Sequence, residues 1–253
     1  MEQELQKASL WKRIAAGIFD LILIAVLATG FGWLLSTVLN YDGYNDTLEA
    51  AYARYESQYG VTFQITQEEY LALEDSQKQN YDAAYEALTA DQEAMHAYSM
   101  AVNLMLVITT ASILLAILCM CFVVPLILGN GQTVGKKIFA LCLMRTDGVK
   151  VNNLQLFARV ILGQFAVETM IPVYVAFMVF WGTVDIFGLL LVAALLIAQC
   201  VCMATTKTNS LLHDLMAGTV VVDFGSQRIF RTTEDLIAHK KQVAADRAAR
   251  QPY

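Results

Sequence analysis

The chain has 253 residues, of which 57% are hydrophobic, and its mean hydropathy is +0.49. This composition is too apolar for an ordinary soluble domain of that length, so it indicates a protein that crosses a membrane several times. The formal net charge of −6 leaves no strongly basic surface, which argues against binding to nucleic acid.

Four apolar runs are each near or above the roughly 20 residues that a membrane-spanning helix needs. They are residues 14–39, 100–128, 157–181 and 186–206. We therefore predict an all-α membrane protein: a four-helix transmembrane bundle with a small helical extracytoplasmic insert and a short cytoplasmic β-pairing. In chain order, we predict an N-terminal segment with the first membrane helix (1–39), the acidic insert (40–99) and the second membrane helix (100–128). A cytoplasmic loop (129–156), the third and fourth membrane helices (157–206) and a cytoplasmic C-terminal segment (207–253) follow.

The distribution of charge predicts the orientation of the helices. Between residues 41 and 99 the chain carries twelve acids but only two bases, Arg54 and Lys78. Most other Lys and Arg residues lie in the segments at the opposite ends of the apolar runs, as the positive-inside rule requires of cytoplasmic segments. We predict that both termini are cytoplasmic and that the acidic segment lies outside.

The acidic segment at residues 40–99 holds nine of the chain's eleven tyrosines. Gly60 is placed to end one helix, and Thr66 with Glu69 fits a capping box that begins another. A second capping box over residues 89–92 would begin a helix that continues into the second apolar run. We interpret the segment as a small helical insert with a core of tyrosines. A cation-collecting vestibule and a partner-binding face are the alternatives.

Two short runs have the composition of β-strands. Residues 138–144 are apolar and precede a turn signal, and residues 219–224 are rich in β-branched side chains. We predict that these runs pair on the cytoplasmic side, with Leu143 near Val221. The glycine- and lysine-rich stretch at 129–137 lacks the spacing of a phosphate-binding P-loop, so it does not predict nucleotide binding.

A carboxylate lies within the first apolar run. Asp20 is the only ionisable residue between positions 14 and 39, where inserting a charge costs roughly 2.5–3.5 kcal/mol, so it needs a partner or a role. Arg13 lies on nearly the same helix face, but about 10 Å away along the axis. Because the two side chains are too far apart to pair, each needs a third group.

The third run contains Arg159, Gln164 and Glu168, followed by Pro172. On a straight α-helix Arg159 and Glu168 would lie on opposite sides, whereas Gln164 and Glu168 would share a face. Pro172 cannot donate to the carbonyl of Glu168, and a free carbonyl beside a carboxylate is typical of cation and proton sites in interrupted helices. The alternative is a kinked helix whose acid binds another helix.

Further polar candidates lie at and beyond the fourth run. Gln199 is the one strongly polar residue of that run, and His213 and Asp214 follow it. No activated serine or cysteine accompanies this pair and its spacing is not that of a zinc site, so we predict no enzyme activity, metal site or cofactor. We expect Asp214 with His213 to be the partner of Arg13.

Together these residues resemble the RDD family of membrane proteins. The family is named for one arginine and two aspartates, which fall here on Arg13, Asp20 and Asp214. The resemblance further rests on the loop at 131–137, on Asp147 and Gly148, on Arg159 and on the segment 213–219, in this order and at this spacing.

The resemblance implies a bacterial multipass protein of the cell membrane. RDD proteins are thought to include transporters, with sodium/proton exchange proposed for some. We therefore expect a small transporter that exchanges a cation for a proton and, because four helices rarely enclose a solute path, forms a homo-oligomer. Its polar residues would be Arg13, Asp20, Arg159, Glu168 and Asp214, with His213, Gln164 and Gln199 as secondary candidates.

A membrane scaffold or assembly factor is the alternative from a different class. In that case the same polar residues would lock the helices together, and the insert at 40–99 would bind a protein partner.

For the C-terminal segment we predict only a short helix over about 234–250, capped by Thr232 or Thr233.

Overall fold

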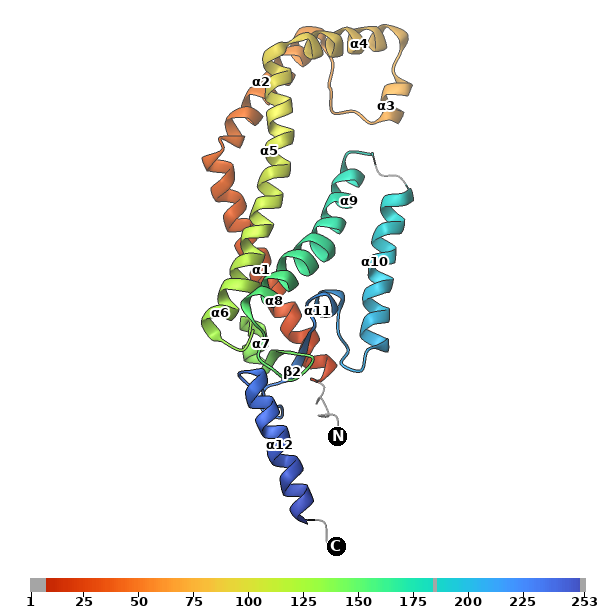
Figure 1. Cartoon of the computed structure of the whole chain (residues 1–253). Coiled ribbons are helices and arrows are strands. Elements are labelled where there is room, and N and C mark those ends of the chain that lie inside the picture. The colour runs from red at the N-terminus through yellow and green to blue at the C-terminus, as the bar shows by residue number, and fades with distance from the viewer. Residues whose placement is uncertain (1–7, 184–185, 251–253) are drawn as a thin grey trace. The chain divides into compact units, whose positions relative to one another are not determined.

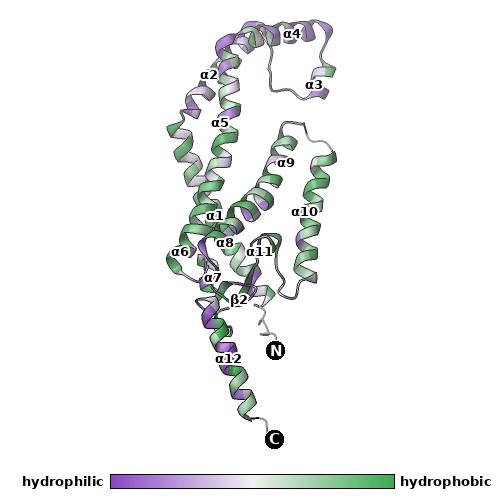
Figure 2. Cartoon of the chain, viewed as in Figure 1, coloured by the Kyte–Doolittle hydropathy of each residue, from purple (hydrophilic) through white to green (hydrophobic). Residues whose placement is uncertain are grey.

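The computed structural model describes residues 8–183 and 186–250 (Figure 1). Four of its helical segments are long and apolar enough to cross a membrane, and Figure 2 shows their hydrophobic residues in green. These segments are Leu10–Val38, Gln92–Leu128, Asn153–Phe180 and Ile186–Thr205. They overlap the four predicted runs and confirm the prediction of an all-α membrane protein.

The described residues fall into two compact units. One unit comprises the chain up to Leu27 and from Ile113 onward, and the other comprises Ala28–Ser112. Helices α1 (Leu10–Val38) and α5 (Gln92–Ile117) contribute to both units. The boundary between the two units therefore falls inside two apolar helices.

The second unit adds α2 (Tyr41–Tyr59), α3 (Gln67–Ala72) and α4 (Asp75–Ala90) to the ends of α1 and α5. Gly60 ends α2 with a positive φ of 65°, and the capping box of Thr66 and Glu69 begins α3, both as predicted. Aromatic rings form part of this unit's core, with the Phe63 ring centroid 5.7 Å from that of Tyr52 and 5.8 Å from that of Tyr81.

The predicted capping box over residues 89–92 is wrong in its detail. Thr89 belongs to α4 and its hydroxyl donates back to the carbonyl of Tyr85. Asp91 instead caps α5, because its Oδ1 accepts from the amides of Glu93 and Ala94 at 3.0 and 3.2 Å. The helix still begins where it was expected and continues into the second apolar run, since aspartate caps a helix at least as well as threonine.

In the first unit, the strands β1 (Leu141–Arg145) and β2 (Thr219–Asp223) pair antiparallel, with Leu143 opposite Val221. This confirms the predicted β-pairing. One face of the ladder packs into a core that includes Ile117 and Val160, whereas Cys142 and Val220 lie in a second buried cluster.

The remaining elements of the first unit follow α5 in chain order. They are η1 (Leu118–Val123), α6 (Val124–Leu128), α7 (Val134–Ile138), α8 (Asn153–Ala158), η2 (Arg159–Met170), α9 (Ile171–Phe180), α10 (Ile186–Thr205), α11 (Leu212–Ala217) and α12 (Thr233–Arg250). Thr232 caps α12, as one of the two predicted alternatives, because its hydroxyl accepts from the amide of Asp235.

The third membrane segment is continuous but not a regular α-helix. Its middle part, η2, is a π-helix of 12 residues between α8 and α9. Hydrogen bonds in a π-helix join residue i to residue i+5, so about nine residues complete two turns. Arg159 and Glu168 therefore lie on the same side, and the prediction that they lie on opposite sides is wrong.

Candidate functional site

The short helix α11 presents His213 and Asp214 to the membrane helices. It lies against η2 at Gly163, where an added Cβ would be 2.5 Å from the Cβ of His213. A glycine at this position permits the close approach of the two helices. Gly218 ends α11 with a positive φ of 61°, and Thr219 begins strand β2 directly after it.

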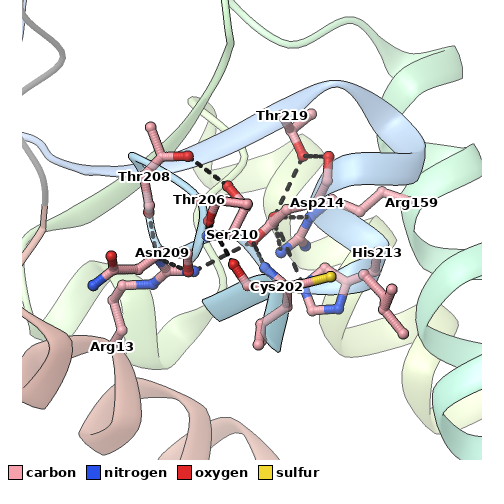
Figure 3. Close-up of polar contacts among 12 residues, drawn as sticks. Arg13, Arg159, Cys202, Thr206, Thr208, Asn209, Ser210, His213, Asp214 and Thr219 are labelled. Atoms are coloured by element: carbon pink, nitrogen blue, oxygen red, sulfur yellow. Dashed lines mark hydrogen bonds and ion pairs between the residues drawn. The ribbon is translucent and has the colours of Figure 1, made fainter. Parts of the chain in front are cut away.

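Asp214 is the centre of a buried ion-pair network (Figure 3). Its Oδ1 lies 2.9 Å from Nη2 of Arg159, and its Oδ2 lies 3.3 Å from Nη2 of Arg13. Burial alone would raise the pKa of Asp214, but attraction from Arg159 and Arg13 outweighs it and holds that pKa well below its usual value. Asp214 is therefore an ionised carboxylate shared between two guanidinium groups.

Arg13 also holds the turn that follows α10. Its Nη1 donates to the carbonyls of Thr208 and Asn209, at 2.9 and 2.6 Å. Asn209 has a positive φ of 51°, which turns the chain back toward α1. The predicted pairing of Arg13 with Asp214 is thus found, and it joins α1, α11 and the end of α10.

Glu168 binds the residue next to Asp214. The Nδ1 atom of His213 lies 2.6 Å from one Glu168 oxygen, and the His213 amide donates to the other at 3.1 Å. Gln199, from α10, also hydrogen-bonds Glu168, and its Oε1 accepts from the amide of Leu212. Because η2 is a π-helix, Arg159 and Glu168 bind neighbouring residues of one short helix without pairing with each other.

Asp20 is placed apart from that network. Its Oδ2 accepts from the hydroxyl of Thr133 at 2.5 Å, and its Oδ1 accepts from the amide of Gly135 at 2.8 Å. An added Cβ on Gly135 would lie 2.4 Å from the carbonyl oxygen of Ala16, so only glycine allows α7 to approach α1 this closely. The third group that Asp20 required is thus the loop at 131–137.

A cavity of about 430 Å³ lies beside these contacts. Its polar lining comes from Arg13, Asp20, Thr133, Lys136, Arg159, Gln164, His213 and Asp214. Gln164 therefore faces the same space as the ion-pair network, although its side chain makes no hydrogen bond with Glu168 in the described part of the chain. Its apolar lining includes Ile14, Ile18 and Leu21 of α1.

Lys136 is a member of this site that sequence reasoning did not single out. It is half-buried, and burial together with repulsion from Arg159 lowers its pKa to about 8. Thr133 and Gly135, which bind Asp20, were also missed as site residues. Both lie in the loop at 131–137 that contributes to the family resemblance, but nothing in that loop indicates a partner more than 100 residues away.

The described residues contain no group of three or more His, Cys, Asp or Glu side chains that could hold a metal ion. The charged and titratable groups at the cavity can bind charge and transfer protons. Arg13, Arg159 and Lys136 supply positive charge at the cavity, and the pair of Glu168 and His213 supplies groups that can exchange a proton.

One of three comparisons with known proteins finds a match. No curated protein and no solved structure matches the chain. A model of the RDD family matches residues 7–218, which include both aspartates, both arginines, Glu168 and His213. The chain is therefore a membrane protein that belongs to the RDD family.

Proposed function

We propose that this RDD protein is a small membrane transporter that couples the movement of a solute to a proton held by Glu168 and His213. The observation that carries the proposal is the 2.6 Å contact between His213 Nδ1 and Glu168 Oε2. An imidazole and a carboxylate at this distance can share one proton. His213 also lines the cavity, which gives the pair a route to a solute.

The other charged residues are better suited to positioning than to proton transfer. Both oxygens of Asp20 are bound by α7 and its cap, and Asp214 is held by two guanidinium groups. Arginine does not lose its proton under ordinary conditions. We therefore assign the proton to Glu168 and His213, not to Asp20, and assign Gln199 to the orientation of Glu168.

The transported solute in this proposal is a small cation, because sodium/proton exchange has been proposed for some members of the RDD family. The test uses the purified full chain in liposomes that contain a pH-sensitive dye, challenged in turn with sodium, potassium and lithium gradients. We expect one of these gradients to change the internal pH. Glu168→Gln should abolish the change, whereas Glu86→Gln, an exposed acid of α4, should leave it intact. Absence of any pH change, or an unaltered change in Glu168→Gln, would contradict the proposal.

The network also favours a second function, that of a membrane scaffold or assembly factor. No buried side-chain nitrogen or oxygen among the described residues lacks a hydrogen-bond partner. A network of this kind can fix how helices pack without binding a solute. In this alternative the segment at 40–99 binds a protein partner.

Folding measurements separate the two functions. If the chain is a transporter, Glu168→Gln should keep nearly the wild-type melting temperature but lose flux. If it is a scaffold, Glu168→Gln should melt at a lower temperature and the wild-type chain should show no flux. The expected homo-oligomer is tested on the same samples, by light scattering of the chain in detergent.

A further inference from the structure

The cavity beside Asp214 has positive charge that the protein itself does not neutralise. Of the cations that line it, Arg13 and Arg159 share the carboxylate of Asp214. The other lining carboxylate, Asp20, accepts from Thr133 and Gly135. Lys136 has no direct partner among the described residues, because no acid lies within 4.0 Å of its ammonium group and that group donates no hydrogen bond. Asp20 and Asp214 attract it only from farther away.

Lys136 is held in this space by the backbone around it. Its amide donates to the hydroxyl of Thr133, and the preceding residue, Gly135, is packed against α1. The side chain is near enough to Arg159 to be repelled by it. A half-buried ammonium beside a guanidinium is unfavourable unless an anion neutralises it.

We propose that this cavity binds the phosphate group of an anionic molecule, with Lys136 as its direct ligand. Arg159 can supply a second donor to the phosphate. Its Nε and Nη2 bind the carboxylate of Asp214, whereas its Nη1 makes none of the contacts with that carboxylate. A phosphate oxygen suits a site that combines a lysine with guanidinium donors.

The apolar lining of the cavity favours a lipid as the source of the phosphate. Ile14, Ile18 and Leu21 line the cavity along one side of α1, and their side chains are 40%, 55% and 64% exposed. An acyl chain can cover this apolar strip while its headgroup phosphate reaches Lys136. This inference does not depend on transport, because a headgroup can be bound by a transporter or by a scaffold.

The test measures thermal unfolding of the full chain after removal of lipid, in a neutral detergent. One arm adds inorganic phosphate and compares it with chloride at equal ionic strength. The other arm compares nanodiscs of phosphatidylcholine alone with nanodiscs of equal parts phosphatidylcholine and phosphatidylglycerol. A bound ligand should raise the melting temperature by about 2–4 °C. A rise in both arms or with phosphate alone supports a site open to free phosphate, and a rise with phosphatidylglycerol alone supports a headgroup site.

Variants of neighbouring lysines connect the effect to this cavity. Lys136→Gln should lose the rise and Lys136→Arg should keep most of it. Lys137→Gln, which removes the same charge from an exposed position, should respond as the wild-type chain does. Native mass spectrometry of each variant counts bound phosphate or phosphatidylglycerol independently of stability. The proposal is overturned if neither ligand raises the melting temperature, or if Lys136→Gln and Lys137→Gln bind equally well.

Discussion

At the residue scale, the negative charge of Asp214 is what compensates the two buried arginines of the site. Replacing Asp214 with asparagine preserves its shape but leaves Arg13 and Arg159 buried without a carboxylate. Removing one partner from a buried ion pair costs about 3–5 kcal/mol. We therefore expect Asp214→Asn to lower the free energy of unfolding in detergent by about that amount.

The matched control for Asp214→Asn is Asp147→Asn. Asp147 lies 2.8 Å from Arg145 in a pair whose side chains are 35% and 38% exposed. Such a surface pair is worth at most about 1 kcal/mol. If the two variants unfold at the same denaturant concentration, the ion pairs of Asp214 do not stabilise the fold as argued here.

We expect the free energy of unfolding to depend on pH in the alkaline range because of Lys136. Because its pKa is lowered to about 8 in the folded chain, the unfolded chain binds more protons above that pH. The free energy of unfolding should therefore rise between pH 8 and about 10.5, by at most about 1.4 kcal/mol per pH unit. The measurement subtracts the profile of Lys136→Gln from that of the wild-type chain, without phosphate or anionic lipid. A difference that is flat or falls over this interval would show that Lys136 is not disfavoured as a cation.

The sequence predicted one contact of the site and missed others, for physical reasons. Arg13 and Asp214 could be paired in advance because a membrane arginine requires an anion and the candidates were few. The partners of Asp20 were not predictable in this way, since Thr133 and the amide of Gly135 carry no charge. Lys136 was not predicted as a site residue, because a lysine in a basic loop is expected to lie on the cytoplasmic surface.

At the element scale, the π-helix η2 determines which residues reach α11. The sequence analysis assumed 3.6 residues per turn, and the apolar residues of this segment do not reveal a different period. The wider turn brings Arg159 and Glu168 to one side, where they bind Asp214 and His213. The membrane helices and the strand pairing were predictable from composition, whereas the sequence of η2 carries no signal of its change of helical period.

The contact between η2 and α11 predicts the effect of enlarging Gly163. A methyl group at this position would lie 2.5 Å from His213 Cβ and 2.7 Å from its Cα, so α11 would have to move. Overpacking of this kind costs about 1–3 kcal/mol, and we expect Gly163→Ala to melt at a correspondingly lower temperature. Gly17→Ala in α1 is the control, since its added methyl group meets nothing within 4 Å. Equal melting temperatures for both variants would contradict the close packing of η2 and α11.

The register of β1 and β2 predicts a specific cross-link. The amide of Leu143 donates to the carbonyl of Asn130, so Leu143 and Val221 face each other without bonding to one another's backbone. Facing residues of this type have closely spaced Cβ atoms, which suits a disulfide. In a chain whose native cysteines are replaced, Leu143→Cys with Val221→Cys should cross-link under mild oxidation. The pair Leu143→Cys and Val220→Cys should not, and the reverse result would indicate a different register.

At the scale of the whole molecule, the candidate site belongs to one compact unit. Its residues come from the chain before Leu27 and after Ile113, whereas the acidic, tyrosine-rich segment belongs to the other unit. The change in composition at residue 40 indicated a separate part of the chain. The sequence did not predict that the boundary falls within α1 and α5, because those helices are uniformly apolar across it.

This division predicts that damage to the second unit leaves the ligand site intact. Phe63 packs beside the Ala51, Leu88 and Ala94 cluster and contacts the rings of Tyr52 and Tyr81. Truncating a buried phenylalanine costs about 3–5 kcal/mol, and Phe63 is only partly buried, so we expect Phe63→Ala to approach the lower end of that range.

Hydrogen exchange measured by mass spectrometry can locate the effect of Phe63→Ala. Exchange should quicken in α2 and α4 but not in α11 or η2. Whichever ligand raises the melting temperature of the wild-type chain, phosphate or phosphatidylglycerol, should also raise that of Phe63→Ala. Leu71→Ala, which removes an exposed side chain of α3, should change neither measurement. If Phe63→Ala also quickens exchange in α11, the two units unfold together. The long helices α1 and α5 would then couple the segment at 40–99 to the site around Asp214.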